Sequence, residues 1–213
     1  MRATARPSAS FRRRAPRRDP YDVVLLACEG SKTEPNYLRE ARLVYRLSSL
    51  NIQIQQPPGN DPLTIVNFAI SQLEADPDYN RAYCVFDRDD HPNFAQAIRR
   101  ADEYERNNTG KLFVIPSVPC FEIWVLLHYR YTTAAYTPAG GQTACERLIR
   151  EVRQHFTDYE KGHKTVFSKL SAMFDQALVN AARLEKHNAD TDTLNPATRI
   201  HQLMNYLKGL RQS

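Results

Sequence analysis

The sequence predicts an α/β fold: a mostly parallel central sheet of about four strands flanked by helices, with an α-helical C-terminal extension. Three observations favour it. Short apolar runs rich in β-forming residues alternate with amphipathic stretches as far as residue 115. Helical periodicity prevails after Pro116. The 213 residues, 42% hydrophobic and 25% charged, suffice for one domain with a sizeable core.

The predicted strands are four short runs of apolar and β-branched residues bounded by turn signals. The first is apolar at every position, as in a strand buried on both faces, and stops at Glu29-Gly30. In the second, isoleucines alternate with glutamines before a Pro-Pro-Gly-Asn turn. The third ends abruptly in acidic residues, and the fourth precedes Pro116. In chain order the strands span residues 23–28, 52–54, 82–86 and 111–115.

The predicted helices begin at capping residues and carry apolar residues at helical spacing. The Thr33 hydroxyl is expected to cap the first helix, and Asp61-Pro62 opens the second. Asn195-Pro196 is expected to cap the last one. Between them, the helical pattern covers residues 92–105, 120–129, 143–156 and 165–185.

Charge is unevenly distributed along the chain. The formal net charge is +5, but the first 18 residues contain seven arginines and no acid, which leaves 22 basic against 24 acidic residues. We expect residues 1–20 to be a basic disordered arm, either a solvated tail or an arm that binds phosphate. We expect an α/β domain over residues 21–118 and a helical region over residues 119–213 that packs on it.

The sequence favours a cytoplasmic protein without a membrane span. Its longest apolar runs, residues 23–28 and 123–127, are far shorter than the roughly 20 residues that a spanning helix needs. The cysteines form no C-x-x-C pair, so we expect small, buried, reduced thiols at Cys28, Cys84, Cys120 and Cys145. The histidines lack zinc-site spacing, and we expect no structural zinc.

Acidic side chains follow the first and third predicted strands. Glu29 ends the first, and Asp87 and Asp89 form a D-x-D after the third. Ligands of parallel sheets bind outside the carboxyl ends of the strands, where strand order reverses, so these carboxylates are expected to meet. Clustered carboxylates resist joint ionisation unless a cation lies among them, and oxygen donors favour Mg²⁺ or Mn²⁺. We predict a catalytic metal site for phosphodiester cleavage; a solvated acidic loop is the alternative.

Other charged residues are candidates for the same site. Glu122 opens an otherwise apolar helix, so it is a fourth carboxylate, a general base or a partner of the helix dipole. His91 can shuttle protons or cap the helix that follows. Four basic residues are placed to meet phosphate, although basic turns are often merely solvated. They are Lys32, Arg88, Lys161 and Lys164.

Four segments resemble the RloB family, Toprim-like proteins associated with restriction-modification and phage-defence loci. They span residues 28–37, 85–92, 119–128 and 195–198. The resemblance implies a Toprim-like fold, with Glu29 as the family's glutamate and Asp87 with Asp89 as its D-x-D pair around Mg²⁺. It also implies nuclease activity on nucleic acid, DNA or RNA such as tRNA, and a separate ABC- or AAA-type ATPase as partner. Arg88 and the arginine arm fall outside the family pattern.

The leading hypothesis is therefore a Mg²⁺-dependent nuclease that acts as effector of an antiphage, abortive-infection-like defence system. The alternative is a non-catalytic module that binds nucleic acid or a partner, with a vestigial acidic pocket and an arginine arm that supplies affinity. A receiver-like phosphoryl domain is a third reading. It fits less well, because a receiver needs paired acids after its first strand and this chain has Glu29-Gly30.

Overall fold

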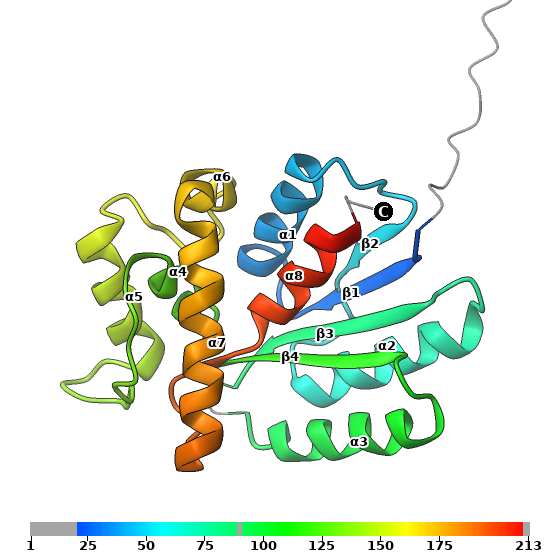
Figure 1. Cartoon of the computed structure of the whole chain (residues 1–213). Coiled ribbons are helices and arrows are strands. Elements are labelled where there is room, and N and C mark those ends of the chain that lie inside the picture. Colours follow the sequence, from blue (N-terminus) through cyan, green and yellow to red (C-terminus); the bar gives the residue numbers. More distant parts are fainter. Residues whose placement is uncertain (1–20, 89–90, 211–213) are drawn as a thin grey trace, which may run out of the picture.

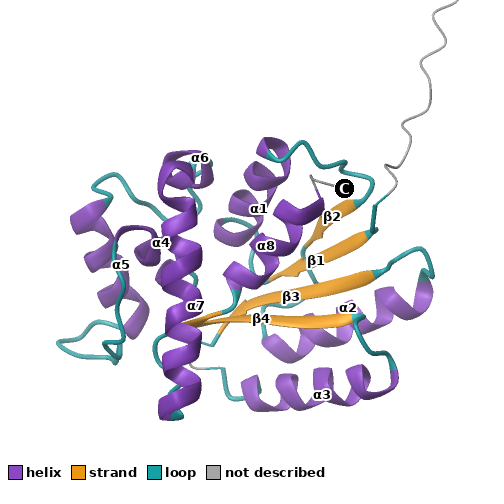
Figure 2. Cartoon of the chain, in the orientation of Figure 1, coloured by secondary structure: helices purple, strands orange, loops and turns teal. Residues whose placement is uncertain are grey.

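The computed structural model describes residues 21–88 and 91–210. Within these residues, five strands form one sheet in the order β2-β1-β3-β4-β5, parallel throughout except for the pair β4 and β5 (Figures 1 and 2). The mostly parallel sheet is confirmed. Its two-residue fifth strand was not predicted, because a dipeptide carries no readable strand pattern. The strands are β1 (Val24–Cys28), β2 (Ile52–Gln55), β3 (Arg81–Asp87), β4 (Leu112–Val118) and β5 (Ala197–Thr198).

Helices cover both faces of the sheet and its carboxyl edge (Figure 1). One face carries α2 (Pro62–Ala75) and α3 (Phe94–Asn107), and the other carries α1 (Thr33–Val44) and α8 (Ile200–Leu210). The remaining helices lie beyond the carboxyl ends of the strands. They are α4 (Glu122–Tyr129), α5 (Ala144–His155), α6 (Val166–Leu170) and α7 (Phe174–Thr191).

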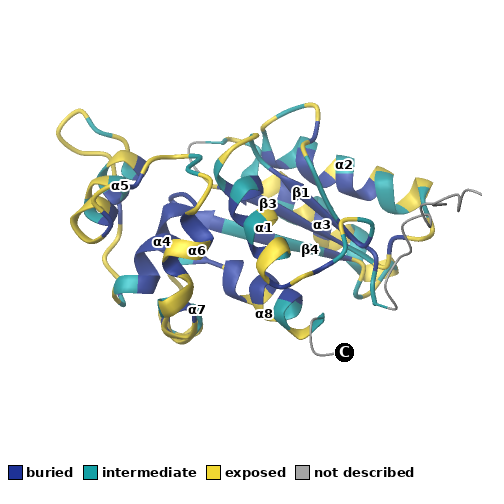
Figure 3. Cartoon of the chain, turned by 90° about the horizontal axis from the view of Figure 1, so that it is seen from above, coloured by how far each residue is buried: buried dark blue, intermediate teal, exposed yellow. Residues whose placement is uncertain are grey.

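Strand β1 shows why the sheet needs helices on both faces. Leu25 and Ala27 belong to the buried cluster under α2 and α3, whereas Val24, Leu26 and Cys28 belong to the cluster under α1. All five side chains are buried, and Figure 3 shows the strands enclosed between helices. The second cluster continues without interruption into α4, α5, α7 and α8. The helical region thus shares one core with the sheet.

Three local expectations about helix ends and continuity are wrong. Thr33 is the first helical residue rather than the cap, and Lys32 before it makes no side-chain capping bond. The last helix begins at Ile200, whose N–H donates to Thr198 Oγ1 (3.2 Å), because β5 occupies the residues after Asn195-Pro196. The helix expected over 165–185 is broken by a 3₁₀ turn, Ser171–Met173, where the Ser171 hydroxyl donates to the Ser168 carbonyl.

The cap expected at Asp61 is confirmed, since its carboxylate accepts from the Thr64 N–H at 3.0 Å. Thr143 and Glu146 form a capping box at the start of α5. None of the helices in the described part of the chain combines the length and apolar character needed to cross a bilayer.

Candidate functional site

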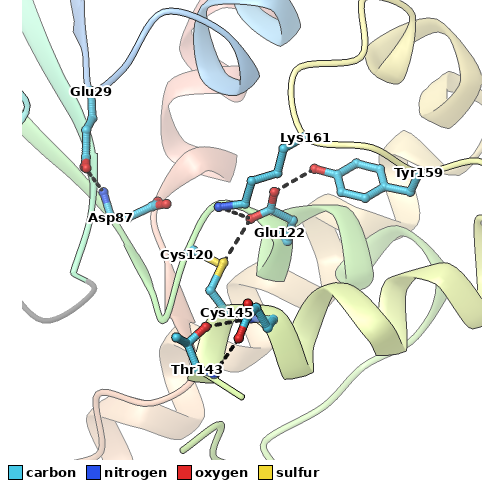
Figure 4. A network of polar contacts seen from close by, with 9 residues as sticks. Glu29, Asp87, Cys120, Glu122, Thr143, Cys145, Tyr159 and Lys161 are labelled. Atoms are coloured by element: carbon cyan, nitrogen blue, oxygen red, sulfur yellow. Dashed lines mark hydrogen bonds and ion pairs between the residues drawn. A yellow bond between two sulfur atoms is a disulfide. The ribbon is translucent and has the colours of Figure 1, made fainter. Parts of the chain in front are cut away.

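The carboxyl ends of β1 and β3 bring Glu29 and Asp87 together. The two strands pair in parallel, with Cys28 opposite Val85, and the Glu29 N–H continues this ladder by donating to the Val85 carbonyl (2.8 Å). The Asp87 N–H in turn donates to Glu29 Oε2 at 2.8 Å (Figure 4). Strand order reverses between β1 and β3, so the pair lies at the position where open parallel sheets bind ligands.

The surroundings of this acidic pair include a histidine. His91 Nε2 lies 3.3 Å from Glu29 Oε1, and the cap of α3 is Asn93, so capping by His91 is wrong. The Asp87 side chain is buried and that of Glu29 is 17% exposed. Asp89, the second aspartate of the D-x-D, and Asp90 lie outside the described residues. Metal binding by Glu29, Asp87 and Asp89 stays a prediction.

Glu122 is the most enclosed acid of the candidate residues. It opens α4, has no exposed surface and accepts a hydrogen bond from the Tyr159 hydroxyl at Oε1 (2.9 Å). Its Oε2 lies 3.8 Å from Lys161 Nζ and 3.6 Å from Cys145 Sγ (Figure 4). Burial, and then the nearby Glu122 charge, raises the pKa of Tyr159 well above its usual range, so this phenol stays a donor. The buried carboxylate therefore has partners, as its burial demands.

Glu34 is a candidate that sequence reasoning missed. It lies in the first turn of α1 and is 8% exposed. Burial raises its pKa to about 8, helped by the charges of Glu122 and Glu29 and opposed by its backbone hydrogen bond and by Lys161. A signal was present: Tyr37, Leu38 and Ala41 follow Glu34 at offsets of three, four and seven residues, the spacing of one buried helix face. The carboxyl group of Glu34 is therefore influenced electrostatically by both Glu29 and Glu122.

This pKa gives a pH dependence of stability. An unfolded glutamate titrates near pH 4.3, so the folded protein holds a proton at Glu34 that the unfolded chain loses between about pH 4.3 and 8. The stability contributed by the neutral carboxyl is complete below that range and is lost as the pH rises through it. Relative to the parent, Glu34→Gln should gain unfolding free energy with rising pH, by up to about 1.4 kcal/mol per pH unit.

Urea unfolding in EDTA at pH 5, 6, 7 and 8 measures this difference. Glu103→Gln, an exposed position on α3, is the matched control and should show a constant offset from the parent. Parallel stability curves for the parent and Glu34→Gln would show that Glu34 is ionised in the folded protein at these pH values.

A cleft of about 800 Å³ opens at the carboxyl edge of the sheet. It is lined by the basic residues Arg88, after β3, and Lys161, in the loop before α6, together with His91 and the acidic residue Glu146 of α5. Tyr136, Thr143 and Cys145 also line the cleft. Lys164 is exposed on the same loop as Lys161 but is not part of the lining, and Lys32 is exposed at the start of α1. Of the four basic candidates, Arg88 and Lys161 therefore line the cleft, and Lys32 and Lys164 do not.

A family model described as RloB-like protein matches residues 24–207, most of the chain. The chain belongs to the RloB-like family. Searches of curated proteins and of solved structures found no match. The matched span of this RloB-like protein contains every candidate site residue and excludes the arginine arm. Its five-stranded, mostly parallel sheet with flanking helices is consistent with a Toprim-like α/β fold.

The cysteine expectation for this RloB-like chain is wrong for one pair. Cys120 and Cys145 form a disulfide, with 5.8 Å between their Cα atoms, and it joins the residues before α4 to the first turn of α5. Cys28 and Cys84 are free and buried, as expected. No short spacing marks the bonded pair, because 25 residues separate its members and only the packing of α4 on α5 brings them together.

The loop that carries Lys161 is held against the start of α1 in the RloB-like protein. The Asn36 side-chain amide donates to the Gly162 carbonyl at 2.8 Å. Gly162 has φ +80°, and a Cβ at this position would lie 2.8 Å from Lys32 Cβ. A side chain at residue 162 is thus opposed by both backbone conformation and space.

Gly162→Ala should therefore destabilise the RloB-like protein more than a matched glycine substitution elsewhere. Gly110 has the same φ of +80° but open space around its Cβ, so Gly110→Ala carries the conformational penalty alone, about 1 to 2 kcal/mol. We expect Gly162→Ala to lose at least about 1 kcal/mol more in urea unfolding, because Lys32 must shift. Equal losses would show that the Lys32 stem yields at no cost.

Proposed function

We propose that this RloB-like protein is a Mg²⁺- or Mn²⁺-dependent nuclease of the Toprim type and the effector of an antiphage, abortive-infection-like defence system. The observation that carries the activity is the contact of Glu29 with Asp87 at the reversal point of the sheet, beside a cleft whose lining includes Arg88 and Lys161. The defence role, and a separate ABC- or AAA-type ATPase as partner, rest on the family resemblance alone.

The ligand atoms that these residues offer are of the type that a hard divalent cation prefers, because Mg²⁺ is bound by carboxylate oxygens. Glu29 and Asp87 would hold it, together with Asp89. The bound ion would supply positive charge to a phosphodiester and to the group that attacks it.

The chain's own cations would bind the nucleic-acid backbone. Arg88, which follows Asp87 in the chain, and Lys161, from the loop before α6, both line the cleft and would bind phosphates of the bound strand. Glu122 is better placed to position Lys161 and Tyr159 than to move a proton to or from the substrate, because it is fully buried and already paired. His91, beside Glu29 and part of the cleft lining, is the better candidate for proton transfer.

The test is cleavage of labelled DNA and tRNA by the full-length protein with Mg²⁺ or Mn²⁺, alone and with the ATPase from its locus. We expect cutting that stops in EDTA and returns when the metal is restored. Failure to cut either substrate with either metal, with and without the partner, would contradict the nuclease proposal.

One observation favours the alternative, a binding module with a vestigial acidic pocket. Both oxygens of Glu29 already have protein partners, the Asp87 N–H at Oε2 and His91 at Oε1. Such a module would bind nucleic acid with unchanged affinity in EDTA and leave it intact. Deleting residues 1–18 would then weaken binding and flatten its salt dependence, because each phosphate contact contributes to the slope.

A further inference from the structure

A second group of metal-ligating side chains lies apart from the acidic pair. Cys120, Glu122 and Cys145 each offer one ligand atom within 4.8 Å of the others, and all three residues are buried. They come from three places in the chain: the segment before α4, the first residue of α4, and the first turn of α5. In the oxidised protein the two sulfurs are bonded to each other.

We propose that reduction of the Cys120–Cys145 disulfide opens a Zn²⁺ site formed by the two thiolates and the Glu122 carboxylate. Tetrahedral zinc with bonds of about 2.3 Å to sulfur and about 2.0 Å to oxygen separates these ligand atoms by about 3.5 Å. The observed distance from Cys145 Sγ to Glu122 Oε2 is 3.6 Å. Once unbonded, the sulfurs need to be about 3.8 Å apart, a separation within reach of side-chain rotation.

The charges around the group suit a zinc ion. Two thiolates and a carboxylate carry three negative charges, so bound Zn²⁺ leaves one, which Lys161 Nζ balances from 3.8 Å away. Both α4 and α5 direct their N-termini toward the group, and helix N-termini stabilise thiolates. The Tyr159 hydroxyl holds Glu122 Oε1, which leaves Oε2 as the oxygen that faces the sulfur.

The redox step requires a dithiol reductant of the thioredoxin class. One reductant thiolate attacks a disulfide sulfur to give a mixed disulfide, and its second thiol then releases the protein thiol. Two electrons and two protons pass to Cys120 and Cys145, and the reductant leaves as a disulfide. Zinc binding then displaces the two thiol protons to solvent.

The experiment compares oxidised protein with protein reduced by dithiothreitol and desalted under argon, both full-length and without an affinity tag. We expect one Zn²⁺ per reduced chain and none per oxidised chain by elemental analysis. Co²⁺ should give a thiolate charge-transfer band only after reduction. Cys145→Ser and Glu122→Gln should each weaken binding at least about tenfold, whereas Cys84→Ser, a buried thiol on the opposite face of the sheet, should bind like the parent.

Absence of zinc from the reduced parent, or an unchanged Co²⁺ band in Cys145→Ser, would overturn the proposal. Alkylation of the unmutated reduced protein, followed by mass spectrometry, keeps the test decisive if a variant does not fold. Zinc should protect Cys120 and Cys145, and equal labelling with and without zinc would also overturn the proposal. These readouts do not involve nucleic-acid cleavage, so their outcome is independent of the nuclease proposal.

Discussion

Asp87→Asn is expected to reduce metal-dependent cleavage by at least about 10²-fold while leaving the fold intact. The amide keeps the size of the buried side chain and preserves the Asp87 N–H bond to Glu29, but it removes one negative charge from the proposed metal site. Glu29→Gln should have a similar effect, since it removes the partner carboxylate. Asp87→Ala, which removes the whole carboxyl group, should abolish cutting. Initial cleavage rates in Mg²⁺, with circular dichroism and thermal unfolding to verify folding, measure the change.

The matched control is Asp102→Asn, which neutralises an exposed aspartate on α3. It should cut at the parental rate. If Asp87→Asn and Glu29→Gln are folded and also cut like the parent, the catalytic assignment at the edge of β1 and β3 is wrong. If Asp87→Asn no longer cuts nucleic acid but still binds it, Asp87 is needed for cleavage and not for the binding by Arg88 and Lys161.

Trp124→Ala should cause the largest loss of stability, about 4 kcal/mol or more. The Trp124 side chain is completely buried, and its indole N–H donates to the Tyr37 hydroxyl at 2.8 Å. It also contacts His128 and Phe174 edge-on, so one ring joins α4 to α1 and α7. Its removal leaves a cavity and an unpaired Tyr37 hydroxyl, each of which is costly.

Urea unfolding followed by circular dichroism measures this loss, because Trp124 is the chain's single tryptophan and its fluorescence disappears with it. Tyr37→Phe is the control: it breaks the same hydrogen bond without a large cavity and should cost about 1 to 2 kcal/mol. Similar losses in the two variants would show that the core refills the space left by the indole. The result also concerns the candidate site, because α4 begins with Glu122 and α1 carries Glu34.

The part of the site built from strand ends could be predicted from the sequence. An apolar run that stops at an acid marks both the end of a strand and the residue delivered to the sheet edge, and this logic placed Glu29 and Asp87 correctly. It works because parallel strands share one carboxyl edge, so local pattern implies a long-range contact.

The helical half of the site could not be predicted, because its contacts depend on how helices pack. Nothing near Cys120 in the sequence indicates Cys145, and nothing near Lys32 indicates Gly162. Glu122 was recognised as an acid that needs a partner, yet Tyr159 lies 37 residues away. Glu34 was missed for the opposite reason: a glutamate in a first helical turn is so ordinary that its buried face was overlooked.

The residues that line the cleft come from two separate parts of the chain. Arg88 and His91 follow strand β3, next to the acidic pair at the sheet edge, whereas the lining residues Lys161, Tyr136, Thr143 and Cys145 come from loops and a helix start in the second half of the chain. Exchanging residues 130–165 between relatives would change the shape and charge of the cleft without altering the strands that hold Glu29 and Asp87. The lining of the cleft can therefore diverge through one segment of the chain while the acidic pair at the sheet edge is kept.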